Sequence, residues 1–133
     1  MNMIELDLNF LKQFTLNKYI QAERQNRYIA SKMKKRATNY CMLTVQQAMV
    51  DGVRFEWPCK LEIKWYLPDK RIDPDNWSFT KKFIFDGMQK ASVRSDVFLP
   101  NDSYKFVTGF DETFEIDKSH PRVEIREINM EVR

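Results

Sequence analysis

Two aspartates that stand two positions apart, Asp73 and Asp75, are the residues of this chain best suited to hold a catalytic metal ion. They lie in the segment RIDPDNW, residues 71–77, and in an extended or turn backbone this spacing sends both carboxylates to the same side. Carboxylates that share a site repel each other, and a cation between them removes the repulsion. Mg²⁺ and Mn²⁺, which prefer oxygen ligands, suit such a pair best.

A purely structural role is the alternative for the same segment. Pro74 would then occupy the second position of a type I turn, and Asp75 or Asn76 would cap the helix that follows. An EF-hand is excluded, because the sixth position of a loop that starts at Asp73 is Ser78, where glycine is required. Local spacing alone leaves both roles open.

The composition of the 133-residue chain is that of one globular domain that does not span a membrane. Apolar residues make up 43% and charged residues 31%, and no uncharged apolar run is long enough to cross a bilayer. The N-terminal segment lacks the basic and apolar regions of a secretion signal. Cys41 and Cys59 have no CxxC spacing and are predicted to be buried, reduced thiols, so we expect a cytoplasmic protein.

Positive charge is concentrated in the first third of the chain, although the net charge is only +3. Tyr19 and Tyr28 interleave with these cations, as they would on a surface that follows a phosphate backbone. A solvated helix face is the alternative. Further cations flank the acidic segment, which fits an enzyme that attracts a polyanion and cuts it with a metal ion. The residues expected to contact nucleic acid are Lys18, Arg24, Arg27, Lys34, Lys35, Arg36, Arg71 and Lys81.

The periodicity of apolar residues predicts an α+β fold in a single domain, residues 1–133. The clearest helix covers 31–50, with Ser31 as its N-cap and Gly52 beyond its end. Residues 16–30 fit either a short helix or an ordered loop, and a further helix should follow the acidic segment. Alternation predicts strands over residues 3–10, 60–65, 104–107 and 122–128, with a loop over 96–103.

The order of strand, acidic turn, helix, Asp-bearing loop and strand resembles the RusA-type Holliday junction resolvases of bacteria and their phages. The resemblance rests first on DKRIDPDN, residues 69–76. It continues in KFIFDGM, residues 82–88, and in NDSY, residues 101–104. The segment LNKY, residues 16–19, is similar to the family's early basic and aromatic region, so the match spans most of the chain.

The resemblance implies a metal-dependent endodeoxyribonuclease with a mixed β-sheet and flanking helices. Asp73, Asp75 and Asp102 would hold Mg²⁺, or Mn²⁺ in its place, and a lysine of the helix would assist. Such enzymes act in DNA recombination and repair as homodimers, and they nick two strands of a four-way junction symmetrically. Branched DNA and a second copy of the chain are therefore the expected partners.

The chain departs from the family pattern at three places. Phe79 stands where the family usually has its lysine, and Lys82 comes three residues later. Asn101 replaces the first of two paired acids. The loop between Asp86 and Asp102 is also longer than the family's usual one.

Helical geometry favours Lys82 over Lys81 as the assisting lysine. On one continuous helix, Asp75 and Lys82 share a face within about 20°, whereas Lys81 lies roughly 120° from Asp75. If Ser78 capped a separate helix instead, Lys82 would fall in its first turns, still near the metal. A surface pair with Asp86 is the alternative role for Lys82.

Phosphodiester hydrolysis also fits these residues without reference to the family. A carboxylate-held metal activates water and neutralises developing charge, and a lysine stabilises the pentacoordinate phosphate. No Ser/His/Asp set, glycine-rich phosphate loop or Cys/His zinc spacing competes in the sequence. A non-enzymatic nucleic-acid binding module, in which the acids serve turns and caps, is the alternative function.

Overall fold

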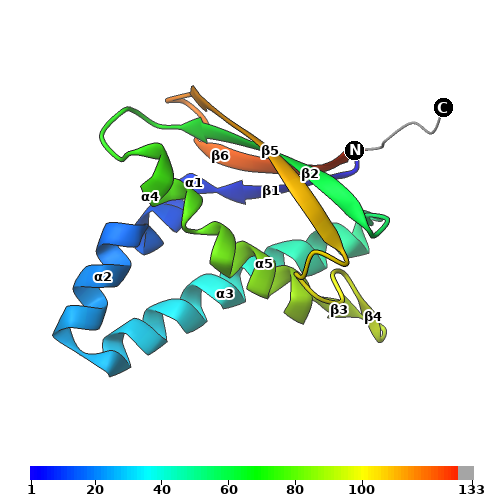
Figure 1. Ribbon diagram of the computed structural model, residues 1–133, viewed down its shortest axis with the longest axis horizontal. Helices are drawn as coiled ribbons and strands as arrows, with labels where there is room; N and C mark the ends of the chain where they lie inside the picture. The colour runs from blue at the N-terminus through cyan, green and yellow to red at the C-terminus, as the bar shows by residue number, and fades with distance from the viewer. Residues whose placement is uncertain (129–133) are drawn as a thin grey trace.

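A four-stranded mixed sheet forms one layer of the structure, and helices cover one of its faces (Figure 1). The computed structural model describes residues 1–128, and it confirms the expected single-domain α+β fold. The strand order is β1-β6-β2-β5, in which β2 and β5 run parallel and the other neighbours are antiparallel. Within the described residues no helix is both long and apolar enough to cross a membrane. The strands of this sheet are β1 (Met3–Asp7), β2 (Cys59–Leu67), β5 (Val107–Ile116) and β6 (Arg122–Ile128).

Strands β2 and β6 lie where the sequence predicts them and supply the centre of the core. Leu61, Ile63 and Trp65 of β2 are fully buried, and the residues between them are only partly buried. Val123 and Ile125 of β6 are also fully buried. Alternation of apolar and polar residues therefore identifies strands that bury one face in the core.

Strand β5 lies at a different place from its prediction. The sequence predicts a strand over 104–107, whereas residues 104–106 form a turn and the strand begins at Val107. Strand β5 is an edge strand, and such strands commonly carry charged residues. Asp111, Glu112 and Glu115 interrupt its apolar pattern and hide the strand from an alternation search.

Strand β1 is shorter than predicted, because the chain turns into a helix at Leu8. The Oδ1 atom of Asp7 accepts a hydrogen bond from the backbone N–H of Asn9 at 2.9 Å and caps helix α1 (Leu8–Leu11). Leu8 and Leu11 are both fully buried, three residues apart on one side of this helix. The alternation that continues beyond Asp7 in the sequence is therefore helical spacing.

The long helix begins four residues earlier than predicted. Its cap is Asn26, whose Oδ1 accepts a hydrogen bond from the N–H of Tyr28 at 2.7 Å, and Ser31 lies exposed within the helix. Gly52, with a φ of +96°, stands just beyond its end, as predicted. Residues 16–30 are helical on both sides of Asn26. The helices of this region are η1 (Lys12–Phe14), α2 (Leu16–Gln25) and α3 (Arg27–Val50).

Two short helices follow β2, because the chain breaks its helical path at Thr80. The buried Oγ1 of Thr80 donates a hydrogen bond to the carbonyl oxygen of Trp77 at 2.7 Å, which satisfies the end of the first helix. A small hairpin over residues 92–97 then follows, and only its second strand falls within the loop predicted over 96–103. These elements are α4 (Pro74–Ser78), α5 (Lys81–Lys90), β3 (Ser92–Val93) and β4 (Asp96–Val97).

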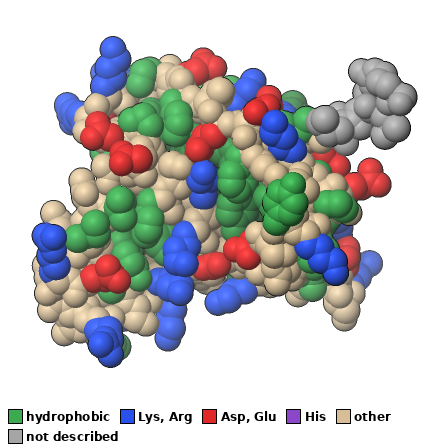
Figure 2. Space-filling model, in the orientation of Figure 1, with side chains coloured by type: hydrophobic (Ala, Val, Ile, Leu, Met, Phe, Trp, Pro, Cys, Tyr) green, Lys and Arg blue, Asp and Glu red, His purple; other side chains and the backbone are tan. Residues whose placement is uncertain are grey.

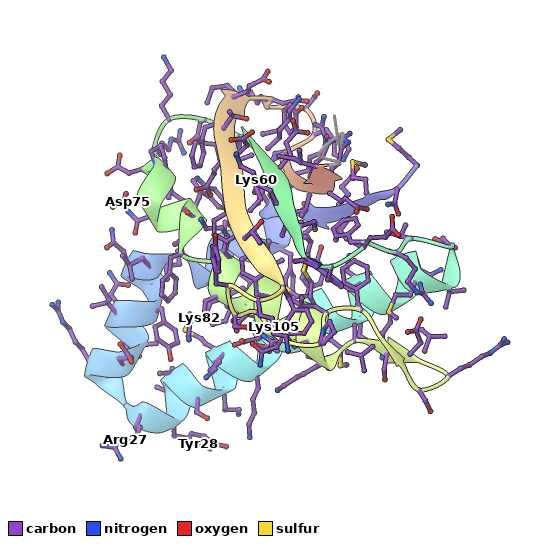
Figure 3. All side chains as sticks on the ribbon, turned by 45° about the vertical axis from the view of Figure 1, so that its right-hand side comes forward. Arg27, Tyr28, Lys60, Asp75, Lys82 and Lys105 are labelled. Carbon is purple, nitrogen blue, oxygen red and sulfur yellow. The ribbon has the colours of Figure 1, made fainter. Side chains whose placement is uncertain are left out.

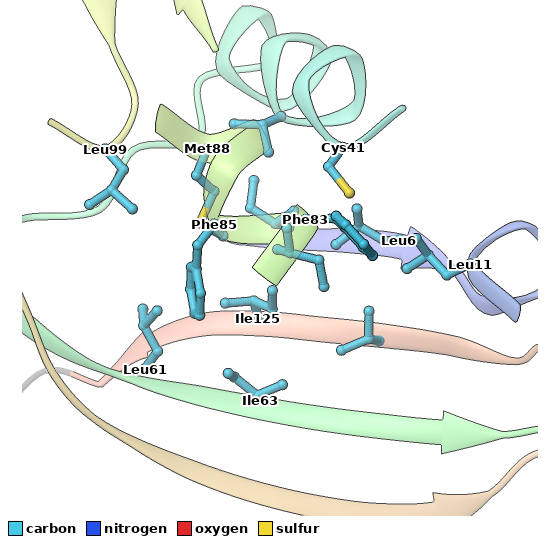
Figure 4. Packing of buried hydrophobic residues seen from close by; sticks show 14 of the residues in the cluster. Leu6, Leu11, Cys41, Leu61, Ile63, Phe83, Phe85, Met88, Leu99 and Ile125 are labelled. Atoms are coloured by element: carbon cyan, nitrogen blue, oxygen red, sulfur yellow. The ribbon is translucent and has the colours of Figure 1, made fainter. Parts of the chain in front are cut away.

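Helices α3 and α5 cross in close contact over the core. A Cβ atom at Gly87 of α5 would lie 2.5 Å from the Cβ of Cys41 and 2.7 Å from the backbone nitrogen of Met42 on α3. Figure 4 shows Phe85 of α5 pointing from the helix toward sheet residues such as Ile125. Glycine at position 87 therefore allows α5 to pack this closely against α3.

Both cysteines are free and buried, as predicted. Burial raises the pKa of the Cys41 thiol to about 12 and that of the Cys59 thiol to about 11. The two thiols therefore stay protonated at neutral pH and pack as small apolar side chains rather than acting as nucleophiles.

A buried carboxylate on the outer face of the sheet, Glu124, couples the stability of the fold to pH. Its oxygens accept hydrogen bonds from Nε of Arg122 at 2.7 Å and from Nη1 of Arg126 at 3.1 Å. Burial raises the pKa of Glu124, but the two guanidinium groups outweigh burial and hold this pKa below its ordinary value of 4.5. The resulting stabilisation is complete above pH 4.5 and is lost as the pH falls through the lower pKa of the folded state.

We expect Glu124→Gln to lower the free energy of unfolding at pH 7 by about 1 kcal/mol, because a neutral amide accepts weaker hydrogen bonds from guanidinium groups. The difference from the wild type should shrink in acid, where the wild-type carboxyl also becomes neutral. Urea unfolding at pH 7 and below pH 4.5 measures both quantities. A difference that stays constant with pH would contradict this role of Glu124.

Candidate active site

The acidic segment leaves the end of β2 and closes as a turn before α4. The Oδ1 atom of Asp69 accepts a hydrogen bond from the backbone N–H of Arg71 at 2.9 Å, which holds the first part of the turn. Asp73 occupies the N-cap position of α4, and its carbonyl oxygen accepts the N–H of Asn76 at 3.0 Å. Pro74 follows at the first helical position, where no N–H is needed. The types of these residues therefore explain the turn and the start of the helix.

The carboxylates of Asp73 and Asp75 are exposed to solvent in this arrangement. The side chain of Asp73 makes no capping hydrogen bond, and Asp75 lies in the first turn of α4 (Figure 3). Neither carboxylate takes part in an ion pair among residues 1–128. The N-cap position thus belongs to Asp73 rather than to Asp75 or Asn76, and both carboxylates remain open to a ligand.

Contacts to three parts of the molecule fix the position of this pair. Trp77, which is 1% exposed, anchors α4 in the core. The Oδ1 atom of Asn76 accepts the backbone N–H of Asn17 at 3.0 Å and ties α4 to the start of α2. The hydroxyl of Ser78 donates a hydrogen bond to Glu112 of β5 at 2.9 Å. The two aspartates therefore stand on a well-anchored backbone, which reduces the cost of ordering them around a ligand.

Glu112 is a residue of this region that the sequence analysis did not single out. Its carboxylate accepts hydrogen bonds from Nε1 of Trp65 at 2.7 Å, from Oγ of Ser78 at 2.9 Å and from Nζ of Lys81 at 3.0 Å. Glu112 thus joins β2, α4 and α5 where these elements meet. In the sequence, Glu112 stands between Phe110 and Phe114, which share its face of β5. A charged residue in such an apolar row is the signal that could have singled it out.

The structure separates the two lysines at the start of α5. Lys81 is mostly buried: its Nζ pairs with Glu112 and lies 4.7 Å from the centre of the Phe110 ring. Lys82 is exposed in the first turn of α5 (Figure 3). Helix α4 ends at Ser78, so the continuous helix that would align Asp75 with Lys82 is not formed, and Ser78 is not the cap of α5. Lys82 nevertheless lies in the first turn of α5, as expected if a separate helix follows the acidic turn.

Asp102, the third expected metal ligand, lies at the opposite end of the sheet from the pair. It is exposed in the loop before β5, and β5 begins beside Cys59 at the start of β2. Asp73 and Asp75 instead follow Leu67 at the end of β2, and the nine residues of β2 span about 26 Å. Among residues 1–128, no three His, Cys, Asp or Glu side chains gather into a group that could hold a metal ion. Within one chain, Asp73 and Asp75 therefore lie at the start of α4, and Asp102 lies apart from them.

The basic residues expected to contact nucleic acid lie mainly on the exposed faces of α2 and α3. Figure 3 shows Arg27 at the outer tip where these two helices meet. Arg36 has a packing role as well, because its guanidinium lies 5.5 Å from the centre of the Phe14 ring and donates to Gln13 at 3.3 Å. The exposed members of the set are Lys18, Arg24, Arg27, Lys34, Lys35, Arg36 and Arg71, whereas Lys81 is held by Glu112.

Exposed carboxylates offer the oxygen ligands that divalent ions prefer, and exposed cations attract phosphodiesters. The pair supplies oxygen ligands, and Lys82 and Arg71 supply positive charge close by in the chain. No protein-family model, curated protein or solved structure matches this chain.

Proposed function

We propose that this protein is a Mg²⁺-dependent endodeoxyribonuclease that resolves four-way DNA junctions by paired nicks. The observation that carries the proposal is the pair of exposed carboxylates, Asp73 and Asp75, on a turn anchored by buried contacts. The choice of branched DNA rests on the resemblance of residues 69–76, 82–88 and 101–104 to RusA-type resolvases. The proposal includes a role in DNA recombination and repair and a cytoplasmic location, where buried thiols stay reduced.

Asp73 and Asp75 would hold the Mg²⁺ ion through their carboxylate oxygens, and Mn²⁺ would serve in its place. Such an ion activates a bound water and neutralises charge on the phosphate. Lys82 would stabilise the negative charge that develops on the phosphoryl oxygens. The cations of α2 and α3 would hold the DNA arms and supply most of the affinity.

The proposal is tested with a synthetic four-way junction that carries a label on each strand in turn. We expect nicks at symmetric positions on two opposing strands when Mg²⁺ or Mn²⁺ is present, and no nicks when the ion is chelated. A linear duplex of the same sequence is the control and should be cut far more slowly. If purified protein leaves the junction intact with either ion, the nuclease proposal fails.

We expect Lys82→Ala to slow single-turnover nicking by about 100-fold, because it removes a cation from the developing charge. Lys81→Ala is the matched control: it removes the contact with Glu112, and its rate at saturating protein should stay close to that of the wild type. Losses of equal size in both variants, or a loss only in Lys81→Ala, would contradict the role given to Lys82.

A dimer follows from the two-fold symmetry of the four-way junction, since paired nicks need two active sites. Strand β5 forms one edge of the sheet in the described residues, and Phe110 and Ile116 on it are 43% and 49% exposed. If β5 of a second copy paired with it in the antiparallel sense, the start of one strand would lie beside the end of the other. Asp102 of the second copy would then reach the same end of the sheet as Asp73 and Asp75.

Mixed dimers of Asp75→Asn and Asp102→Asn test this arrangement. We expect each variant alone to be inactive and the mixture to regain cutting, because a mixed dimer would keep one site with both aspartates intact. A monomer by light scattering at micromolar concentration, with and without junction DNA, would contradict the dimer. A mixture without activity would place Asp102 in its own chain's site, and full activity of Asp102→Asn alone would remove it from the site.

A nucleic-acid binding module without catalysis is the second candidate. The observation that favours it is the separation of Asp102 from the aspartate pair within one chain. It predicts salt-dependent binding of the junction, since the basic surface is the same, but no nicks with Mg²⁺ or Mn²⁺.

A further inference from the structure

A cleft of about 990 Å³ is lined by residues of α3 and α5, two helices that pack against each other. Lys34 and Lys35 line it from α3, and Asp86 and Lys90 line it from α5. On the face shown in Figure 2, Lys and Arg side chains gather where α3 passes α5. The cleft reaches the last turn of α5, whereas the aspartate pair lies before the first turn.

The charges of the cleft favour an anion. Lys82, Asp86 and Lys90 follow one another at four-residue spacing, so they share one face of α5. Lys34 and Lys35 are exposed on α3, and neither takes part in an ion pair among residues 1–128. Four cations line the cleft against a single carboxylate, that of Asp86; they are Lys34, Lys35, Arg36 and Lys90.

The wall of the cleft carries a polar group without a partner. Thr38 lines the cleft and is 4% exposed, and its hydroxyl has no hydrogen-bond partner in the described part of the chain. Buried hydroxyls are normally paired, so a group left unpaired at a ligand-sized hollow indicates a missing acceptor. Asn39, the next residue of α3, also lines the cleft and adds a side-chain amide to its wall.

We propose that this cleft binds the phosphate backbone of one DNA strand, at a distance from the cut. The proposal rests on the proposed function and extends it by naming where a strand is held. Lys34, Lys35 and Lys90 would neutralise the phosphates, and Thr38 would donate a hydrogen bond to a phosphate oxygen. Asp86 opposes the anion and weakens its binding.

The experiment measures DNA binding separately from cutting. Fluorescence anisotropy with labelled junction DNA is recorded in the Asp75→Asn background, in chelator and over a range of salt concentrations. We expect Lys90→Ala to weaken binding by about five- to tenfold at low salt and to reduce the salt slope by about 1. Asp86→Asn should tighten binding by about threefold, because it removes the opposing charge while keeping the shape.

Two further variants separate the cleft from general charge effects. Thr38→Val keeps the side-chain shape and should weaken binding without lowering the melting temperature. Lys64→Ala on the outer face of the sheet removes the same charge away from the cleft, and it should leave affinity close to that of the parent.

Each result decides one question. If the cleft variants bind like the parent while the wild type still nicks junctions with Mg²⁺, the cleft proposal is overturned and the nuclease proposal stands. If Asp86→Asn weakens binding, or if Lys64→Ala acts like Lys90→Ala, the cleft is not the binding site. If the parent protein does not bind DNA at all, both proposals fall.

Discussion

Replacing Asp75 by asparagine is expected to abolish cutting while junction binding is retained. The substitution keeps the size of the side chain and removes the charge that would hold Mg²⁺. Because a bound metal contributes several kcal/mol to the stabilisation of the transition state, the single-turnover rate should fall at least about 100-fold. Affinity should stay the same or increase, since phosphate contacts supply most of it and a negative charge is lost.

Asp69→Asn is the matched control for this prediction. Asp69 lies in the same segment, but it holds the turn by accepting the N–H of Arg71, and an asparagine oxygen is able to accept the same bond. Its loss of charge should change the nicking rate little. Wild-type cutting by Asp75→Asn, or equal losses in both variants, would show that the pair does not serve as a metal ligand.

Gly87→Ala is expected to be the most damaging small substitution in the core. The new methyl group would lie 2.5 Å from the Cβ of Cys41 and within 2.9 Å of two backbone atoms of α3, which are unable to move aside without shifting the helix. Overpacking of this kind costs about 3 kcal/mol, and the better helix propensity of alanine returns about 1 kcal/mol. The net loss of about 2 kcal/mol should lower the melting temperature by roughly 5–10 °C.

Gly109→Ala tests whether the loss of stability in Gly87→Ala comes from the close crossing of α3 and α5 rather than from replacing a glycine. A Cβ at Gly109 of β5 would meet only the Lys60 side chain, at 3.7 Å, which is an ordinary contact. This variant should be as stable as the wild type or slightly more stable, because glycine weakens strand interiors. Thermal unfolding followed by circular dichroism measures both variants. A Gly87→Ala protein as stable as the wild type would mean that α3 and α5 do not cross so closely.

Elements that bury one regular face could be predicted from the sequence. Strand β2 shows strict alternation because Leu61, Ile63 and Trp65 all enter the core. The body of α3 could be predicted for the same reason, since Ala37 and Cys41 lie on its buried side. The spacing of apolar residues reflects which face of an element is buried, and these elements are buried on one side along their whole length.

The helix ends that depend on capping, and the charge-rich edge strand β5, could not be located in this way. The start of α3 depends on the hydrogen bond that the Asn26 side chain accepts from the Tyr28 N–H, and the break between α4 and α5 on the buried hydroxyl of Thr80. Strand β5 keeps charged residues because, within residues 1–128, one of its edges has no neighbour in the sheet. Such features depend on one or two contacts, which leave no periodic trace in the sequence.

The sequence places Asp73 and Asp75 in one turn because they are two positions apart, and the structure puts them at the N-cap and in the first turn of α4. That they hold a metal ion stays a prediction. Glu112 was not singled out, because its partners Trp65 and Ser78 come from other elements. The position of Asp102 likewise depends on the parallel pairing of β2 with β5, which no local pattern specifies.

Binding of Mn²⁺ followed by amide NMR tests most directly whether the acidic turn holds a catalytic metal. Mn²⁺ is paramagnetic and broadens the signals of nearby amides, so the affected residues mark the site. We predict that substoichiometric Mn²⁺ broadens Asp73, Asp75 and Asn76 first, that excess Mg²⁺ reverses the effect, and that Asp75→Asn removes it. Broadening spread evenly over the acidic residues of the surface, or unchanged in Asp75→Asn, would contradict the account.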